Sequence, residues 1–462
     1  MNFTDADVSR MIERQHEFYF TGATRPAGFR KAMLNRLKEA IEAREKAIEE
    51  ALYQDLRKSP FEAYVTEIGF VLSSIKHVLK NLDEWMEPEA AKTPIHLQPG
   101  KSWVEREPYG SVLIIGPFNY PFQLIMEPIV GAIAGGNCIV AKPSESSPRT
   151  AAVVREILES SFPPDYIRVA EGAKEETSAL IHAPFDSIFF TGSVAVGKVV
   201  MKAAAERLTP VTLELGGKSP AVVDQTADLK TAAERIAWGK FSNAGQTCVA
   251  PDYVAVHQSV REPFLRELEK AIVRFYGKDA SASDDYGRIV NEKQFDRLHG
   301  ILGKERQSVS YGGRTDRSDL YIEPTVLADT DFDSPSMEDE LFGPILPVLM
   351  YDNLGDLIRR MRKLPKPLAG YIFTENEQAA RYFTEQLPFG GGCINDTISH
   401  VGNIHLPFGG IGSSGMGNYH GKASFDVFTH EKAMLDRSTA IPMRAAFPPY
   451  GSKLKYIKPL IK

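Results

Sequence analysis

The stretch Ser111-Val112-Leu113-Ile114-Ile115-Gly116-Pro117-Phe118-Asn119-Tyr120-Pro121 begins as an apolar run and ends in a turn that two prolines constrain. Similar apolar runs follow it, with helical patterns between them. Continuous apolar strands that alternate with helices predict parallel βαβ units, whose sheet is covered on both faces. The further strands are expected at Cys138–Ala141, Tyr166–Val169, Ser187–Phe190 and Val211–Leu213, and the helices near Phe122–Ala134, Thr150–Ser160, Lys174–Ile181 and Val194–Arg207.

A second alternating region begins after Gly217, so the chain is predicted to hold two α/β domains with a hinge at Leu213–Lys218. Its expected strands are Pro220–Val223, Tyr253–Val256, Tyr321–Leu327 and Ile345–Tyr351, and its expected helices lie near Leu229–Phe241, Val260–Tyr276 and Glu292–Lys304.

The residues before the first sheet are predicted to form packing helices. A second helical pattern runs from Phe61 to Trp85, and two short extended runs around Pro99-Gly100, within Ile95–Val104, predict a hairpin. Because an isolated hairpin is only marginally stable, we expect it to pair with another element, such as a second subunit. The first helical face consists of Leu34, Leu37, Ile41, Ile48, Leu52 and Leu56.

Composition excludes several classes of protein. The 462 residues are 43% hydrophobic and 25% charged, and the net charge of −6 provides no overall basic field for nucleic acid. Three widely separated cysteines argue against a disulfide framework and for a reducing compartment. No signal peptide and no membrane-spanning run is recognisable. We therefore expect a soluble cytoplasmic protein without a nucleic-acid or membrane partner, and a basic tail that is a solvated arm.

Cys248 and Glu214 are the strongest candidates for chemistry. Cys248 follows Asn243-Ala244-Gly245-Gln246-Thr247, among small and polar residues where a thiol is expected to ionise and attack. Glu214 lies in Leu213-Glu214-Leu215-Gly216-Gly217-Lys218, on a turn whose glycines would let the carboxylate move. The carboxylate is then a base either for the thiol or for a water molecule.

The turns after the first-sheet strands supply the other candidates. In Phe190-Thr191-Gly192-Ser193-Val194-Ala195-Val196-Gly197, glycines open a helix whose N-terminus favours a phosphate, although for this motif alone a plain turn before a helix is the better explanation. Lys142 and Glu145 follow another strand and are suited to ribose hydroxyls, against the alternative of a surface pair. Glu145 would repel a 2′-phosphate, which favours NAD over NADP. Asn119 is either a pinned oxyanion donor or an ordinary turn residue.

Two later segments are less specific. In Glu338-Asp339-Glu340-Leu341-Phe342-Gly343-Pro344, Glu340 is suited to hydroxyl groups and Phe342 to a planar ligand, although a charged loop explains the pattern as well. The glycine-rich run Pro407–Gly417 lacks the ending of a Walker motif. His400 and His405 have no obvious further ligands, so we predict no metal site.

Taken in order, these motifs resemble the aldehyde dehydrogenase superfamily from about residue 5 to about residue 440. Each motif is weak alone, whereas seven in the right order are very specific. The motifs are Pro117-Phe118-Asn119, Lys142-Pro143-Ser144-Glu145, Phe190-Thr191-Gly192-Ser193, Glu214-Leu215-Gly216-Gly217-Lys218, Gly245-Gln246-Thr247-Cys248, Glu340-Leu341-Phe342-Gly343-Pro344 and Pro407-Phe408-Gly409-Gly410.

The chain is most similar to the soluble class 3 branch, because it starts directly with helices and has Ala250-Pro251-Asp252-Tyr253 after the nucleophile. The segments Asn395-Asp396 … His400 and Tyr419-His420-Gly421-Lys422 also resemble that branch. One departure is Phe118, where class 3 members often have Trp. Its tail lacks the long hydrophobic extension of the membrane-bound members.

The resemblance implies a division of the chain. Residues 1–85 and 105–212 would form a Rossmann-like cofactor-binding domain, and residues 213–415 an α/β catalytic domain. Residues 86–104 and 416–440 would form a small β element for oligomerisation, and residues 441–462 the C-terminal tail. By the same resemblance, the hairpin and the region after Tyr419 pair across a homodimer.

The resemblance also implies oxidation of an aldehyde to the carboxylic acid through a thiohemiacetal and a thioester on Cys248, with Asn119 holding the oxyanion and Glu214 activating water. NAD would be the cofactor, with NADP as the alternative. Its expected binding residues are Lys142, Glu145, Gly192, Ser193, Gly197, Leu215, Gly216, Glu340 and Phe342. The substrate, a medium- or long-chain aliphatic or an aromatic aldehyde, would meet Tyr120, Trp238, His400 and Ile404, although an aromatic residue near a site more often belongs to the core than selects a substrate.

Two alternatives stay open. A CoA-acylating aldehyde dehydrogenase would transfer the acyl group to a thiol, but it would not need a base at Glu214. A catalytically silent structural or binding member of the family would not need Cys248, Glu214 and Asn119 together.

Overall fold

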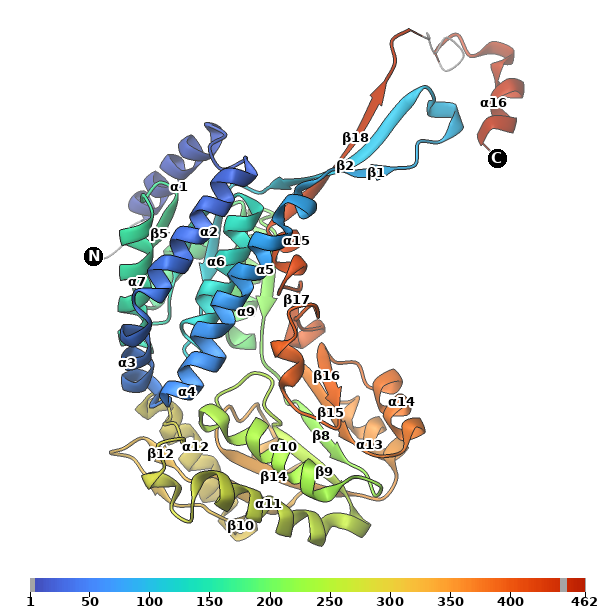
Figure 1. Ribbon diagram of the computed structural model, residues 1–462. Helices are drawn as coiled ribbons and strands as arrows, with labels where there is room; N and C mark the ends of the chain where they lie inside the picture. The colour runs from blue at the N-terminus through green and yellow to red at the C-terminus, as the bar shows by residue number, and fades with distance from the viewer. Residues whose placement is uncertain (1–4, 441–446, 462) are drawn as a thin grey trace.

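The computed structural model describes residues 5–440 and 447–461. It consists of two α/β lobes, one above the other, and a β-arm that projects from the first lobe (Figure 1). The predicted α/β fold class is confirmed.

The first lobe is built on a six-stranded sheet with the strand order β17-β7-β6-β3-β4-β5. Strands β7 to β5 run parallel, whereas β17 pairs antiparallel with β7. Every residue of β3, β4 and β6 is buried, as their continuous apolar runs predicted. The strands are β3 Ser111–Ile115, β4 Cys138–Lys142, β5 Ile167–Val169, β6 Ser187–Thr191, β7 Val211–Glu214 and β17 Gly415–Met416.

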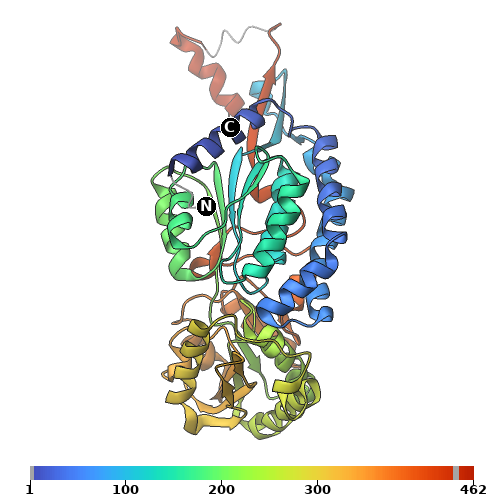
Figure 2. The same cartoon turned by 90° about the vertical axis from the view of Figure 1, so that its left-hand side faces the viewer.

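Helices cover both faces of this sheet (Figure 2). Because side chains alternate along a strand, Val112 and Ile114 join one hydrophobic core and Leu113 and Ile115 join the other. Helices α2, α5, α6 and α7 pack on the first core, and α1, α8 and α9 on the second. The helices are α1 Asp5–Phe20, α2 Ala27–Glu42, α3 Glu45–Leu56, α4 Pro60–Ala63, α5 Gly69–Met86, α6 Gln123–Gly135, α7 Pro148–Ser161, α8 Lys174–Ile181 and α9 Val194–Ala205, with a π-helical turn Tyr64–Ile68 between α4 and α5.

The second lobe is built on a seven-stranded sheet with the order β10-β13-β14-β9-β8-β15-β16, parallel except for β10. Helices α10 to α12 pack on one face and α13 and α14 on the other. The strands are β8 Pro220–Val223, β9 Tyr253–His257, β10 Val309–Tyr311, β13 Thr325–Thr330, β14 Ile345–Tyr351, β15 Ala369–Phe373 and β16 Gly391–Ile394, and the helices are α10 Leu229–Phe241, α11 Arg261–Tyr276, α12 Glu292–Lys304, α13 Leu354–Met361 and α14 Glu377–Gln386.

Two details of this sheet differ from expectation. The prediction of a single strand at Tyr321–Leu327 is wrong. The first part of this range forms β12, Tyr321–Ile322, which pairs outside the main sheet with β11, Thr315–Asp316. Pro324 separates β12 from β13, since a proline has no N–H to donate to a ladder. The sheet also extends over β15 and β16, which were not anticipated because glycines interrupt their apolar runs.

The arm is a three-stranded antiparallel sheet with the order β1-β2-β18. Its strands are β1 Glu89–Ala91, β2 Gly100–Pro108 and β18 Thr429–Arg437. The predicted hairpin exists, but its position is wrong: Ile95–Leu97 is a 3₁₀ turn within the connection, and Glu89 pairs with Val104. Strand β2 of the hairpin also pairs with β18 of the same chain. The two segments that were predicted to pair across a dimer, the hairpin and the region after Tyr419, therefore pair with each other within one chain.

The end of the chain continues beyond this arm. Short helix α15, Lys422–Val427, precedes β18, and α16, Leu454–Ile461, lies near the tip of the arm (Figure 1). Part of the predicted tail, residues 441–446 and 462, lies outside the described residues. Among the helices of residues 5–440 and 447–461, none has both the length and the apolarity that a bilayer span requires.

Candidate active site

The predicted site residues of the first sheet lie where its parallel strands end. Asn119 follows β3, Lys142 closes β4, Gly192 follows β6, and Glu214 is the last residue of β7. These strands are neighbours in the sheet, so their carboxyl ends form one continuous edge. The strand that carries Glu214 leads directly into the second lobe, which brings Cys248 to the same edge.

Backbone conformation holds the loop that carries Cys248. Asn243, Ala244 and Gly245 are all left-handed, with φ of 50°, 51° and 76°. At Gly245 a Cβ atom would lie 2.3 Å from the carbonyl oxygen of Gly343, so the two loops touch through their backbones. Glycine is the residue that meets both requirements.

Gln246 fixes the other side of this loop. Its buried side-chain amide donates to the Arg288 carbonyl at 2.9 Å and accepts from the Val290 N–H at 2.9 Å. The next residue, Thr247, is hydrogen-bonded through its hydroxyl to that of Tyr120 at 2.8 Å. The thiol is therefore presented from a constrained loop.

The protonation states differ from the expectation of a readily ionised thiol. Burial, together with the nearby carboxylates of Glu340 and Glu214, raises the pKa of Cys248 to about 12. Burial also raises the pKa of Glu214 well above its usual range, and neither carboxyl oxygen has a hydrogen-bond partner among the described residues. The expectation that small and polar neighbours promote ionisation is wrong here, because the thiol is partly buried and two acidic side chains lie near it. A thiol of this kind needs a base during attack.

The second acidic candidate, Glu340, lies against the glycine turn after β7. A Cβ atom on Gly216 would come within 2.0 Å of Glu340 Oε2, so only glycine leaves room for the carboxylate there. Burial and the nearby Asp252 raise the pKa of Glu340 to about 8, although a hydrogen bond from the Gly217 N–H lowers it in part. The acidic loop thus closes over the Leu215–Gly217 turn.

Two contacts hold this acidic loop. Lys218 pairs with Asp252, whose other oxygen accepts from the Leu341 N–H at 2.9 Å. The Phe342 ring meets the Phe118 ring edge to face, with centroids 5.7 Å apart. The aromatic side chain at position 118 therefore packs on the predicted cofactor loop, although it is not the Trp that class 3 members often have.

The predicted cofactor residues form a suitable cradle. Lys142 Nζ lies 2.5 Å from Glu145 Oε2, and Ser193 caps α9, whose N-terminus points its amide dipoles toward an anion. A Cβ atom on Gly197 would come within 2.6 Å of Leu215, so Gly197 lets α9 approach the turn after β7. The donor set and the open helix end fit a dinucleotide.

The predicted substrate residues are placed differently. Tyr120 lies beside the Cys248 loop through Thr247, whereas Trp238 on α10 is 44% exposed. His400 Nδ1 lies 3.5 Å from Cys393 Sγ, and burial lowers its pKa to about 4. Ile404 is half-buried on the loop before Phe408. The described contacts join only Tyr120 to the loop of the nucleophile.

Sequence reasoning missed several neighbours of the site. Burial raises the phenol pKa of Tyr419, and the nearby Glu214 and Cys248 add to this rise. It lies within a motif noted for family resemblance, so a signal existed. Lys58 and Glu67, both buried beneath Asn119, have no such signal, because a helix rich in Lys and Glu appears solvated.

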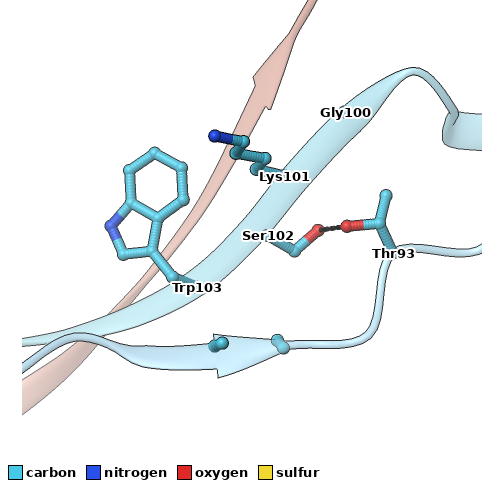
Figure 3. A pocket seen from close by; sticks show the side chains of 7 residues that line it. Thr93, Gly100, Lys101, Ser102 and Trp103 are labelled. Carbon is cyan, nitrogen blue, oxygen red and sulfur yellow. Dashed lines mark hydrogen bonds between the residues drawn. The ribbon is translucent and has the colours of Figure 1, made fainter.

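A separate hollow of about 370 Å³ lies on the arm (Figure 3). Ala90, Ala91, Thr93, Gly100, Lys101, Ser102 and Trp103 line it, and Thr93 and Ser102 are joined through their hydroxyls at 2.8 Å. These residues belong to the hairpin and not to either sheet edge, so the hollow is not part of the candidate site. Within the described ranges, no cluster of His, Cys, Asp and Glu could hold a metal.

Comparison with known proteins identifies the family of the chain. A family model described as the aldehyde dehydrogenase family matches residues 1–434. The 4,4'-diaponeurosporen-aldehyde dehydrogenase of Staphylococcus aureus is 51% identical over 96% of this chain and 97% of its own length. Human aldehyde dehydrogenase family 3 member B1 is 45% identical over 96% of this chain and 94% of its own. A solved substrate-bound state of Staphylococcus aureus AldH, 50% identical, superimposes over 100% of both chains with a TM-score of 0.97.

Proposed function

The chain belongs to the aldehyde dehydrogenase family and is an aldehyde dehydrogenase, and on this premise we propose that Cys248, Asn119 and Glu214 carry out the reaction. The observation that carries the proposal is the pairing of Cys248 with Glu214. The two residues come from different sheets of the fold, and Glu214 is close enough to Cys248 to raise the pKa of its thiol. Glu214 is a buried carboxyl with no hydrogen-bond partner among the residues that the structure describes, which is the state expected of a base held ready.

The thiol is the nucleophile in this proposal. Cys248 Sγ attacks the aldehyde carbon as its proton passes to a base, and the oxygen that becomes negative is held by the Asn119 amide and the Cys248 N–H. The raised pKa of the thiol means that this proton transfer accompanies attack. NAD(P), which the family uses, accepts a hydride when bound.

Glu214 acts on water in the second half of the reaction. In its ionised form, a carboxylate with a raised pKa is a stronger base, so the Glu214 carboxylate can take a proton from the water that cleaves the thioester on Cys248. The glycines of the Gly216–Gly217 turn that follows Glu214 are proposed to let its carboxylate move, and Glu340 lies against Gly216. A CoA-acylating enzyme would have no use for a base in this place.

NAD is proposed as the cofactor, with NADP as the alternative. Lys142 and Glu145 are proposed to meet the adenine ribose, and Gly192, Ser193 and the start of α9 to face the pyrophosphate. Because Glu145 already accepts a hydrogen bond from Lys142, the pair presents both an acceptor and a donor. Glu340 and Phe342 are proposed to orient the nicotinamide ribose.

We propose a medium- or long-chain aliphatic or an aromatic aldehyde as the substrate. A cluster of uncharged aromatic rings lies near the site. His420 is neutral because burial lowers its pKa to about 3, and its ring stacks on Phe408 with centroids 5.2 Å apart. Tyr419 meets the same cluster near Cys248. These rings are buried, and we expect uncharged, aromatic surroundings of this kind to favour apolar chains. The Staphylococcus aureus relative is itself named for an aldehyde.

The division into domains and the homodimer are part of the proposal. The cofactor domain would be residues 1–85 and 105–212, the catalytic domain residues 213–415, and the oligomerisation element residues 86–104 and 416–440. The arm supports a dimer because the outer edge of β1 is exposed, and an unpaired strand edge can accept another strand. Light scattering of the purified chain tests this, with a monomeric mass counting against it.

The proposed roles are tested by two variants and one control. Cys248→Ala should abolish NADH formation from aldehydes, whereas Cys393→Ala, which removes another partly buried thiol, should not. Glu214→Gln should keep a burst of NADH of about one equivalent and slow the steady state by roughly 10²-fold to 10⁴-fold. Substantial turnover by Cys248→Ala would refute the nucleophile. A rate that rises only when CoA is added would favour the acylating alternative.

A further inference from the structure

Lys58 and Glu67 form an ion pair that is wholly buried between the N-terminal helices and the first sheet. Lys58 Nζ lies 2.5 Å from Glu67 Oε1, and both side chains are 0% exposed. Lys58 precedes α4, while Glu67 lies in the π-helical turn. Taking two charges out of water is costly, and apolar side chains of similar size often give equal or greater stability. Overall stability is therefore a weak explanation for this pair, and π-helical turns are frequent at functional sites.

Glu67 holds the start of α6. Its second oxygen, Oε2, accepts hydrogen bonds from the N–H groups of Phe122 and Gln123, both at 2.9 Å. These N–H groups stand at the N-terminus of a helix, where they have no carbonyl partner within the helix and where a negative charge is favoured. The carboxylate thereby fixes the residues that follow Asn119 in the chain.

Lys58 holds the turn itself. Its ammonium donates to the backbone carbonyl of Asn119 at 3.0 Å and lies 3.8 Å from the centroid of the Tyr120 ring. A cation over an aromatic face is attractive, more so when water is excluded. One ammonium group thus contacts the proposed oxyanion donor and the residue beside it.

The same carbonyl connects the turn to the nucleophile loop. Asn119 O also accepts from Asn243 Nδ2 at 2.8 Å, so both of its lone pairs are used. Asn243 is the first left-handed residue of the Cys248 loop. Tyr120 makes the second connection, through Thr247. The distance between the oxyanion donor and the nucleophile is consequently set by contacts that converge on Lys58.

We propose that Lys58 and Glu67 are positioning residues for catalysis: the buried pair holds the Asn119–Gln123 segment so that the Asn119 amide meets the oxygen of the bound aldehyde when Cys248 attacks. This inference rests on the proposed function, in particular on the role of Asn119. Neither residue contacts the reacting atoms, and each acts through Asn119. An oxyanion donor is effective only when it is held in place before the charge develops.

The test is a double-mutant cycle on the rate of acylation of Cys248 in the full-length chain. Lys58→Met is made alone and together with Asn119→Ala, and the burst of NADH from a saturating aldehyde is followed by stopped flow in each variant. Alone, Lys58→Met should slow acylation by roughly 10-fold to 100-fold, a part of the loss expected on removing one oxyanion donor. In the Asn119→Ala background the same change should slow it by less than about threefold, because the donor that it positions is already gone.

Two further variants keep this test decisive. Lys58→Met leaves the buried Glu67 carboxylate without its cation and could prevent folding. The variant with both Lys58→Met and Glu67→Gln removes both charges. It replaces the single variant if that one misfolds, and it should slow acylation by the same roughly 10-fold to 100-fold. Lys31→Met is the matched control: Lys31 pairs with Asp83 at 2.5 Å on the surface of neighbouring helices, and its loss should leave the burst unchanged.

The outcomes separate the two levels of the proposal. If Lys58→Met slows acylation equally in both backgrounds, Lys58 does not act through Asn119, and the inference is overturned while the proposed function stands. If Asn119→Ala alone leaves the burst intact, the oxyanion role fails, and the inference fails with it. A loss confined to the affinity for aldehyde, with the acylation rate at saturation unchanged, also overturns the inference.

Discussion

The substitution Gly245→Ala tests how tightly the nucleophile loop is held. Gly245 has a φ of 76°, a conformation that costs an L-residue roughly 1–2 kcal/mol. The added Cβ would also lie 2.3 Å from the Gly343 carbonyl oxygen and 2.5 Å from its carbon. Because these are backbone atoms, they cannot turn aside as a flexible side chain would, and the repacking costs about 1–3 kcal/mol more.

The expected result is a loss of about 2–5 kcal/mol in the free energy of unfolding. Gly343 follows Phe342 in the loop that carries Glu340, and Cys248 follows Gly245 in the nucleophile loop. A change in this contact should therefore displace both loops, so that aldehyde oxidation falls together with stability. Both effects have one cause, the separation of two touching backbones.

Urea unfolding followed by tryptophan fluorescence, with the burst of NADH measured in parallel, provides the assay. The matched control is Gly300→Ala on α12, where a Cβ would meet nothing within 4 Å. This control should be neutral or more stable by about 0.5–1 kcal/mol, as expected for alanine in a helix. If the two variants unfold at the same urea concentration and turn over at the same rate, the reasoning about the loop contact is wrong.

Gly216→Ala should weaken cofactor binding without a large loss of stability. The nearest atoms to its added Cβ belong to the end of the Glu340 side chain, which can move, so the free energy of unfolding should change by less than about 1 kcal/mol. The Kd for NAD, measured by calorimetry, should rise about tenfold or more, and an unchanged Kd would remove Glu340 from the cofactor site. Glu127→Gln should alter the pH dependence of stability, because burial raises the pKa of Glu127 to about 7. A folded carboxyl with a raised pKa contributes stability that is complete below about pH 4 and lost as the pH rises through about 7, on the order of 3 kcal/mol. Urea midpoints of the parent should therefore fall over that range more than those of the variant, and parallel curves would contradict the assignment.

Local patterns in the sequence were sufficient for much of the fold. The buried strands β3, β4 and β6 follow from uninterrupted apolar runs, and the helical face from Leu34 to Leu56 follows from its spacing. Strands with glycine or proline were harder: β15 and β16 were missed, and β12 and β13 were merged. Their positions depend on neighbouring strands, which supply the burial that their own residues do not signal.

The candidate site shows the same division. The order of Asn119, Lys142, Gly192, Glu214, Cys248 and Glu340 along the chain predicted both the family and the sheet edge, because each residue follows a recognisable strand or turn. The protonation state of Cys248 was predicted incorrectly, since its pKa depends on partial burial and on the acidic groups of Glu214 and Glu340, which are distant in sequence.

The sequence alone therefore determined the family, the alternation of strands and helices, and the residues proposed for chemistry. All of these depend on short-range patterns, which a linear chain records directly. Only the tertiary structure decided that Glu340 lies over Gly216, and that Lys58 and Glu67 lie beneath Asn119. Such contacts join residues far apart along the chain, and their energies come from desolvation and close approach, which exist only after the two sheets and the helices have packed.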